Sequence, residues 1–344
     1  MLLSDFDYAL PEELIAQQPL GQRDASRMLL VDRNERTWKD SEFRRFPDYI
    51  RQNDVIVVNN TRVFPARLVG QRDPTGGRVE VLLTHEIEPN TWEALVKPAQ
   101  RLKIGACLRF GDLRAEILDW STSGLRHLRF DGPIAQLLDT LGQTPLPPYI
   151  KRTEGTSPAG LDDRERYQTI YARARGAIAA PTAGLHFTPA VMNELQARGA
   201  RLAEITLHVG YGTFEPVRVD HVEDHHVDSE FIQIREDAAR AINEGRAAGG
   251  RVIAVGTTTT RALESAVSDD GKVMARAGQT ALTILPGYKF RITDALLTNF
   301  HLPRSSLLLL VAAFAGRELT LEAYRHAVMK QFRFYSYGDC MFVI

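Results

Sequence analysis

Short apolar runs alternate with polar loops and amphipathic segments over most of the chain. Two runs near the start, Arg27–Asp32 and Val55–Asn59, are brief and rich in branched residues, as buried strands are. From residue 176 onward the pattern becomes a repeat of strand, loop and helix. The apolar strands expected there are Ala177–Ala180, Leu202–His208, Arg251–Val255 and Ala295–Thr298. This alternation predicts an α/β domain with a mixed sheet and flanking helices.

Capping residues mark the ends of the predicted helices. Thr188 and Pro189 open a helix, because Thr is a good N-cap and Pro is tolerated in the first turn. This helix runs to about Arg198 and stops at Gly199, since glycine accepts the conformation that ends a helix. Another helix is expected near Asp237–Ala248.

Residues 61–145 have a different pattern of hydrophobic and polar positions. Short alternating segments follow one another with glycines between them, which is typical of a small antiparallel barrel. The six segments are Arg67–Val69, Arg78–Leu83, Trp92–Val96, Cys107–Phe110, Arg114–Trp120 and Leu125–Phe130. We therefore expect an inserted β-barrel domain at 61–145 and a discontinuous α/β catalytic domain made of 1–60 and 146–344.

Composition narrows the class of protein. The 344 residues are 44% hydrophobic and carry a net charge of −1, so binding to nucleic acid must come from local patches. The only cysteines, Cys107 and Cys340, exclude a zinc ribbon and a disulfide framework and fit a reducing cytosol. The mixed, acidic start does not resemble a signal peptide, so a cytoplasmic protein is expected. His225-His226 is the only metal-like cluster, and its spacing matches no zinc signature, so no metal is expected.

Each of the four later strands ends in a loop of Gly, Thr, His or aromatic residues. Ligands bind at the carboxyl ends of strands in open α/β sheets, so these loops are expected to converge. His186, His208 and His301 stand at such ends, where an acid/base role competes with the structural role that a lone histidine usually has. The loop Gly256–Arg261 lacks the lysine of a phosphate loop. Its hydroxyls suit a carboxylate or a ribose, or they merely cap the helix that follows.

The segment 146–175 is basic and contains interleaved tyrosines. Cations with aromatic rings suit single-stranded RNA, because bases stack on rings while cations meet phosphates. An exposed, charged connector is the alternative. The residues expected to meet RNA are Lys151, Arg152, Arg164, Arg166 and Tyr167.

Long motifs follow one another in order along nearly the whole chain. They are Asp5–Tyr8 through Ile15–Gln17, Asn60–Val63 with Pro65–Leu68, Pro147–Ile150, Glu165–Thr169, Ala180–Phe187, His208–Phe214, Gly256–Ser265, Thr298–Pro303 and Ser336–Asp339. In these motifs the chain resembles the S-adenosylmethionine:tRNA ribosyltransferase-isomerases of queuosine biosynthesis. The resemblance implies an α/β domain with an inserted barrel, which agrees with the hydrophobic pattern.

The resemblance also implies a reaction. Members of this family transfer and isomerise the ribosyl part of S-adenosylmethionine onto 7-aminomethyl-7-deazaguanine at the tRNA wobble position, giving epoxyqueuosine-tRNA, adenine and methionine. S-adenosylmethionine is then a consumed co-substrate, and no cofactor is expected. The expected partner is the precursor-bearing tRNA, with no membrane, and the expected state is a monomer.

This chemistry needs groups that exchange protons, because the carbon beside the sulfonium must lose a proton and leaving adenine must gain one. His186, His208 and His301 are the candidates. The residues expected to bind S-adenosylmethionine or the nucleobase are Thr182, Gly184, Leu185, Phe187, Gly210, Gly212, Thr213, Thr257, Thr258, Arg261, Asn299 and Phe300. Asp228 stands where the family often has a histidine, so a role of that histidine does not transfer.

Two alternatives stay open on the sequence. One is a tRNA methyltransferase that uses S-adenosylmethionine, although no glycine-rich nucleotide motif follows the first strand. The other is a non-catalytic tRNA-binding protein that uses the barrel and the basic segment.

Overall fold

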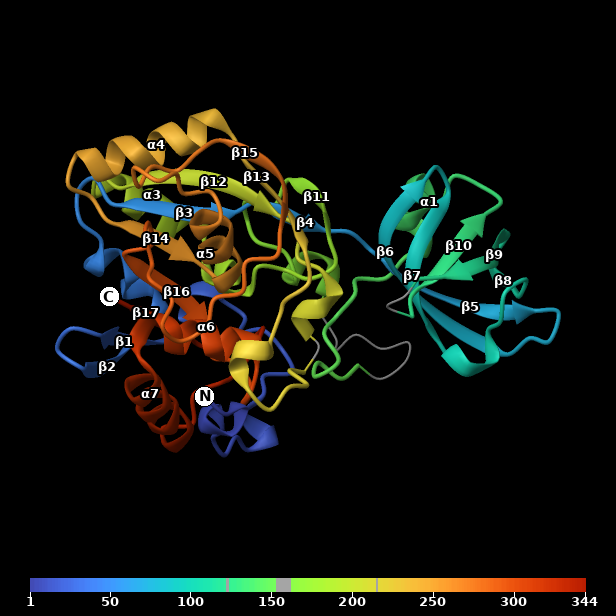
Figure 1. The fold of residues 1–344 in the computed structure, drawn as a ribbon, viewed down its shortest axis with the longest axis horizontal. Coiled ribbons are helices and arrows are strands. Elements are labelled where there is room, and N and C mark those ends of the chain that lie inside the picture. Colours follow the sequence, from blue (N-terminus) through green and yellow to red (C-terminus); the bar gives the residue numbers. More distant parts are fainter. Residues whose placement is uncertain (122–123, 153–161, 215) are drawn as a thin grey trace.

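The computed structural model describes residues 1–121, 124–152, 162–214 and 216–344. A larger α/β body lies beside a smaller β-barrel, and the two are joined by a narrow neck of chain (Figure 1). None of the helices in these ranges has the length and apolarity needed to cross a membrane.

A nine-stranded mixed sheet forms the centre of the larger body. Its strands are β1 (Arg27–Asp32), β2 (Thr37–Glu42), β3 (Val55–Asn59), β12 (Arg201–Leu207), β13 (Glu230–Ile234), β14 (Val252–Val255), β15 (Arg276–Thr280), β16 (Ala295–Asn299) and β17 (Cys340–Val343). They lie in the order β15-β13-β12-β3-β14-β16-β17-β1-β2. The central strands β12, β3, β14 and β16 are parallel, so their carboxyl ends share one edge of the sheet.

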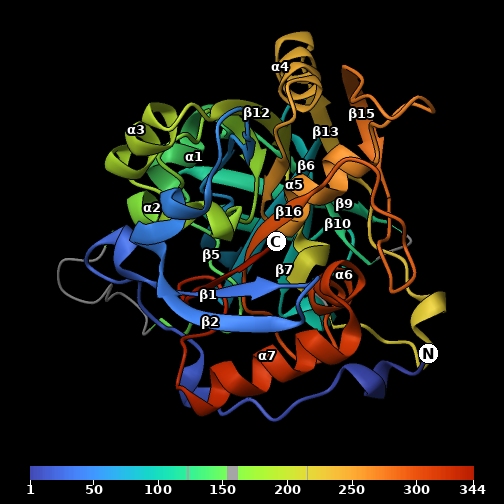
Figure 2. The same cartoon turned by 90° about the vertical axis from the view of Figure 1, so that its left-hand side faces the viewer.

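Both faces of this sheet are covered, as its apolar strands require. On β3, Val55 and Val57 belong to the cluster formed with α4 (Glu236–Ala247), α5 (Thr257–Glu264), α6 (Ser306–Ala315) and α7 (Arg317–Met329). Ile56 and Val58 belong to the opposite cluster, which includes α3 (Pro189–Ala197) and the 3-10 helix η4 (Phe43–Tyr49). In Figure 2, α3 lies at the upper left and α7 along the bottom. The predicted cap of α3 is confirmed, since Thr188 Oγ1 accepts from the Val191 N–H at 3.3 Å.

The smaller body is a closed antiparallel barrel with its own hydrophobic core. Its strands are β5 (Arg67–Asp73), β6 (Arg78–Glu88), β7 (Thr91–Lys97), β8 (Cys107–Phe110), β9 (Leu113–Trp120) and β10 (Arg126–Phe130). All six predicted segments are strands of this barrel. Gly70 is needed where strands cross closely, because a Cβ there would lie 2.3 Å from the Arg109 carbonyl oxygen. The helix α1 (Ile134–Leu141) follows the last strand.

The chain leaves and re-enters the larger body side by side. Before the barrel it forms β4 (Thr61–Val63), and after the barrel and the short helix α2 (Asp163–Arg166) it forms β11 (Ala174–Ala177), parallel to β4. The predicted strand over Ala177–Ala180 is therefore wrong, since only its first residue is in a strand and that strand is outside the main sheet. The run is apolar for another reason. Ile178, Ala179 and Ala180 pack into three different hydrophobic clusters.

A buried ion pair fixes the start of the central strands. Asp54 is fully buried and accepts hydrogen bonds from the backbone N–H groups of Arg51 (2.9 Å) and Arg251 (2.8 Å) and from Arg251 Nη2 (2.6 Å). Removing one member of such a pair leaves a buried charge without its partner.

We expect Asp54→Ala to lower the free energy of unfolding by about 3–5 kcal/mol, seen as a lower urea midpoint. The matched control is Asp237→Ala, which breaks an exposed ion pair with Arg235 and should leave the midpoint nearly unchanged. Equal midpoints for the two variants would contradict this role of Asp54.

Candidate active site at the carboxyl edge of the sheet

A cavity lies at the carboxyl ends of the parallel strands. Its walls come from the four loops that the sequence predicts to converge, together with three tyrosines from elsewhere. The lining residues are Tyr149, Tyr167, Ala179–Ala183, Val209, Gly256–Thr258, Thr298, Asn299, His301, Leu307, Tyr335 and Ser336.

The first turn of α5 forms one wall. Gly256 has a φ of +96°, in the left-handed region that favours glycine, and this lets the chain turn from β14 directly into the helix. Thr259 Oγ1 donates to the Val255 carbonyl at 2.7 Å and Thr260 Oγ1 to that of Gly256 at 3.2 Å. These two hydroxyls therefore bond backwards along the helix and do not cap it. Thr257 and Thr258 line the cavity, beside backbone N–H groups that have no partner within the helix.

Aromatic rings form another part of the wall. The rings of Tyr149 and Tyr335 meet edge to face, and Tyr149 Oη lies 2.5 Å from Ser336 Oγ. Tyr335 has a φ of +73°, which is unusual for a bulky residue and marks a position held by its surroundings. The Asn299 side chain contributes to this hold by donating Nδ2 to the Tyr335 carbonyl at 2.8 Å. A cavity lined by rings, hydroxyls and an amide suits a flat, polar heterocycle.

His301 is the candidate histidine that lines the cavity. The ring atom Nε2 lies 2.8 Å from Thr298 Oγ1. The backbone N–H of His301 donates to Tyr324 Oη at 3.2 Å, and its backbone carbonyl accepts from Tyr8 Oη. Burial lowers its pKa to about 3, because the charged form loses its hydration. His301 is thus a neutral imidazole near pH 7.

His186 lies behind the cavity wall rather than in it. Its Nδ1 is 2.7 Å from Ser26 Oγ and its Nε2 is 3.2 Å from Asn299 Oδ1. The amide of Asn299 donates elsewhere through Nδ2, so Oδ1 is an acceptor and the proton is on His186 Nε2. Burial lowers the pKa of His186 to about 4. With both nitrogens engaged, this ring orients Asn299.

His208 lies beside the strands β4 and β11. Its Nδ1 is 2.8 Å from Thr61 Oγ1, and its ring stacks on Phe231. Gly176 approaches so closely that a Cβ would lie 2.6 Å from the ring. His208 is half-buried, and its burial lowers its pKa. It is not among the residues that line the cavity.

A larger groove runs between the barrel and the α/β body. Thr84, His85 and Glu93 border it from the barrel, and Leu307 borders both groove and cavity. From the body come Gly210, Gly212, Asp228, Glu230, Arg261 and Ser306, among others. The Asp228 carboxylate lies against Gly212, where a Cβ would be 2.1 Å from Oδ2. No group of three or more metal-ligating side chains is found within the described ranges, the groove included.

The structure separates the remaining predicted binding residues. Thr182, Thr257, Thr258 and Asn299 line the cavity, while Gly210, Gly212 and Arg261 line the groove. Phe187 and Phe300 are fully buried in the core, and Gly184 packs against Tyr171 Oη. Leu185 borders a smaller recess beside His186. The side chain of Thr213 lies outside the described residues.

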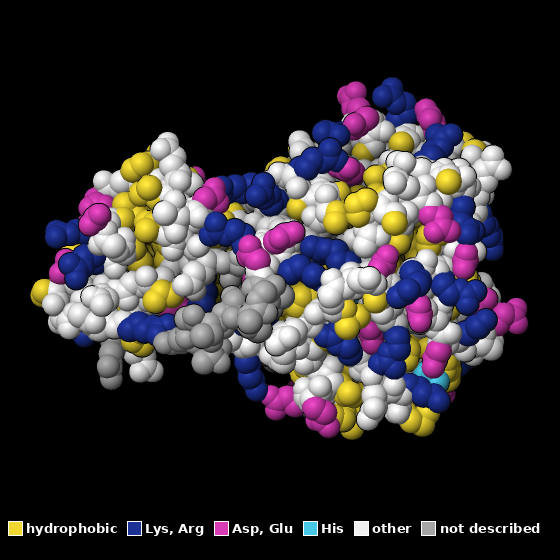
Figure 3. Space-filling model, turned by 180° about the vertical axis from the view of Figure 1, so that it is seen from behind, with side chains coloured by type: hydrophobic (Ala, Val, Ile, Leu, Met, Phe, Trp, Pro, Cys, Tyr) yellow, Lys and Arg dark blue, Asp and Glu magenta, His cyan; other side chains and the backbone are white. Residues whose placement is uncertain are grey.

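Most of the predicted RNA-binding residues have partners within the protein. Arg152 forms two hydrogen bonds with Asp163, at 2.8 and 2.9 Å. Arg164 donates to carbonyl groups at the end of α1, and Arg166 to those of Leu20 and Gly21. Lys151 pairs with Glu12 in an exposed position, and Tyr167 is fully buried in the cavity wall. On the face seen in Figure 3, lysine and arginine side chains are spread over both bodies and gather near their junction.

Sequence reasoning missed several residues of this site, above all Tyr335, Leu307 and Glu230. Tyr335 and Tyr149 come from segments far apart in the chain, and nothing local links them. The signal available was the motif Ser336–Asp339, which resembles the family motif and directly follows Tyr335.

Comparisons with known proteins agree with this arrangement. Residues 3–343 match the family described as "Queuosine biosynthesis protein". The chain is 48% identical over its whole length to the S-adenosylmethionine:tRNA ribosyltransferase-isomerase of Natranaerobius thermophilus, 99% of which is covered. A crystal structure of the S-adenosylmethionine tRNA ribosyltransferase of Thermotoga maritima is similar, with a TM-score of 0.57, 36% identity and coverage of 99% of this chain and 100% of that one. The chain therefore belongs to the family of queuosine biosynthesis proteins.

Proposed function

We propose that this chain is an S-adenosylmethionine:tRNA ribosyltransferase-isomerase. It transfers the ribosyl part of S-adenosylmethionine to tRNA, isomerises it, and releases adenine and methionine. The observation that carries this function is the 48% identity, over the full length of the chain, to an enzyme of that name. The methyltransferase and the non-catalytic alternatives are not favoured by this similarity.

The acceptor that we propose is 7-aminomethyl-7-deazaguanine at the wobble position of a tRNA. We also propose that the enzyme acts in the cytoplasm as a monomer and uses S-adenosylmethionine as a consumed substrate, without a bound cofactor. Of the linker cations, Lys151 is exposed and suits a phosphate. Arg152, Arg164 and Arg166 instead shape the linker through their internal hydrogen bonds.

We further propose that the adenine of S-adenosylmethionine occupies the cavity. A base removes a proton from the carbon beside the sulfonium, and the acceptor amine forms a bond to the anomeric carbon as adenine leaves with the bonding electron pair. The electron pair on the deprotonated carbon then forms a bond to the anomeric carbon, whose bond to the ring oxygen breaks, and that oxygen attacks the carbon that carries the sulfur. Closure of the epoxide then expels methionine. Neutral His301, on the cavity wall, supplies a hydrogen bond to the leaving adenine. His186 acts as a positioning residue through Asn299, and His208 is the third candidate for proton exchange.

Incubation with S-adenosylmethionine and precursor-bearing tRNA should release adenine and methionine in equal amounts, measured by chromatography. Omission of the tRNA should abolish this coupled release, because the acceptor amine is then missing. Release of S-adenosylhomocysteine would identify a methyltransferase. Tight tRNA binding without either release would identify a non-catalytic protein.

We expect His301→Ala to lower turnover by at least ~100-fold, since it removes the imidazole that we propose to donate a hydrogen bond to the leaving adenine. The matched control is His326→Ala. His326 Nε2 lies 2.7 Å from Asp40 Oδ1, and neither residue lines the cavity. Both variants should be compared at a temperature at which thermal unfolding shows them folded. Full turnover by His301→Ala would exclude His301 from the chemistry.

The depressed pKa of His186 makes stability depend on pH. Its folded-state pKa is about 4 against an ordinary value of 6.5, so between these values the unfolded chain binds a proton that the folded chain excludes. Stability should therefore fall as the pH drops from 6.5 toward 4, and His186→Gln should reduce the slope of urea midpoint against pH. If wild type and His186→Gln showed the same slope, protonation of the buried His186 ring would not lower the free energy of unfolding.

A further inference from the structure

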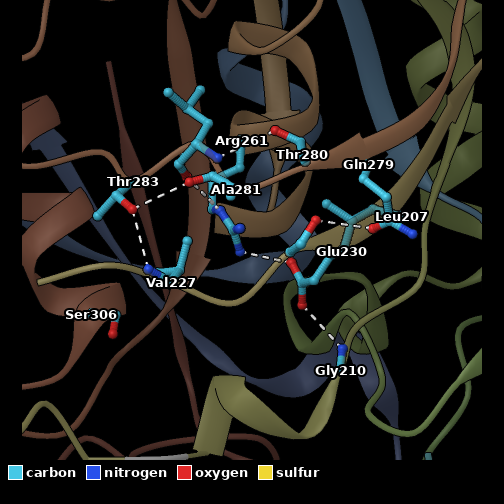
Figure 4. A network of polar contacts seen from close by, with 12 residues as sticks. Leu207, Gly210, Val227, Glu230, Arg261, Gln279, Thr280, Ala281, Thr283 and Ser306 are labelled. Carbon is cyan, nitrogen blue, oxygen red and sulfur yellow. Dashed lines mark hydrogen bonds and ion pairs between the residues drawn. The ribbon is translucent and has the colours of Figure 1, made fainter. Parts of the chain in front are cut away.

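One charged pair in the groove is held unusually well. Glu230, on β13, and Arg261, on α5, have side chains that are only 5% and 7% exposed. Arg261 Nη1 donates to Glu230 Oε2 at 2.7 Å, and Glu230 Oε1 accepts from the Gly210 N–H at 3.0 Å (Figure 4). Arg261 Nε donates to the Leu282 carbonyl at 3.0 Å. Backbone groups from two loops therefore fix the orientation of both charges at the groove wall.

The pair is incomplete on the arginine side. Arg261 Nη2 is buried and has no hydrogen-bond partner among the described residues. A buried donor without an acceptor destabilises the protein that contains it, so such an atom needs an explanation. An arginine fork is built to hold carboxylates through two of its N–H groups, and here one amino group is still unused.

A pair of opposite charges in a groove complements a ligand that also carries both charges. We propose that Arg261 and Glu230 bind the α-carboxylate and the α-ammonium group of the methionyl end of S-adenosylmethionine. This proposal rests on the proposed function. It assigns the adenine end of that substrate to the cavity and the methionyl end to the groove. The carboxylate meets the arginine, and the ammonium meets the glutamate.

The position of the pair fits the length of such a ligand. Arg261 lies one helical turn from Thr257 and Thr258, so one short helix reaches both the cavity and the groove. Leu307 borders both spaces and provides an apolar surface between them. Adenine in the cavity thus leads to a methionyl chain that crosses Leu307 into the groove. There the carboxylates of Asp224 and Asp228 also line the wall and offset the sulfonium charge.

The test measures binding of S-adenosylmethionine and of its decarboxylated analogue by calorimetry, with the full chain. Wild type should bind S-adenosylmethionine roughly 10- to 100-fold more tightly than the analogue, as charge-assisted hydrogen bonds predict. Arg261→Gln should lose that factor for S-adenosylmethionine and bind the analogue as wild type does. Arg261→Lys, which keeps the charge, should recover part of the difference and serves as the variant that folds if Arg261→Gln does not.

A purely structural pair would behave differently. Arg251→Gln, which breaks the buried pair with Asp54 outside both spaces, should change affinity for the two ligands by the same factor. The assignment of the methionyl end is wrong if wild type releases adenine and the Arg261 variants change the affinity for both ligands by the same factor. It is also wrong if these variants still bind S-adenosylmethionine more tightly than the analogue, to the same extent as wild type. If wild type neither binds S-adenosylmethionine nor releases adenine, the proposed function itself has failed and this assignment fails with it.

Discussion

The complete burial of α5 constrains the rest of the larger body. All eight residues of this helix are buried, although they include four threonines, an arginine and a glutamate. Polar side chains are tolerated in such a place only when they find partners, so the surrounding segments must supply them. Glu264 accepts from the N–H groups of Ile292 and Thr293 at 3.2 and 2.9 Å and thereby fixes the chain just before β16. Arg261 ties α5 to β13 by donating to the Glu230 carboxylate at 2.7 Å.

The position of α5 determines where the candidate active site forms. Because α5 starts at the carboxyl end of β14, its first turn meets the loops after β12 and β16 at one edge of the sheet. Asn299, at the end of β16, holds the aromatic wall in place, because its amide joins His186 to the Tyr335 carbonyl. One turn further along the helix, Arg261 lines the groove beside the barrel. The short helix α5 therefore contributes residues to both the cavity and the groove.

The hydrophobic pattern predicts much of this structure, because local packing decides it. Alternation identified all six barrel strands, and the cap at Thr188 identified the start of α3. The pattern failed at Ala177–Ala180, where apolar residues serve three clusters instead of a strand. It also could not rank the histidines. His186 and His301 both follow apolar runs, and only the fold shows that one lies behind Asn299 and the other in the cavity.

In the proposed complex, one substrate spans the cavity and the groove along α5. A crystal structure with S-adenosylmethionine bound tests this claim most directly. The adenine should lie between Tyr335 and the first turn of α5, with the carboxylate within hydrogen-bonding distance of Arg261. A methionyl end that lies in the aromatic cavity, or anywhere away from Glu230 and Arg261, would contradict it.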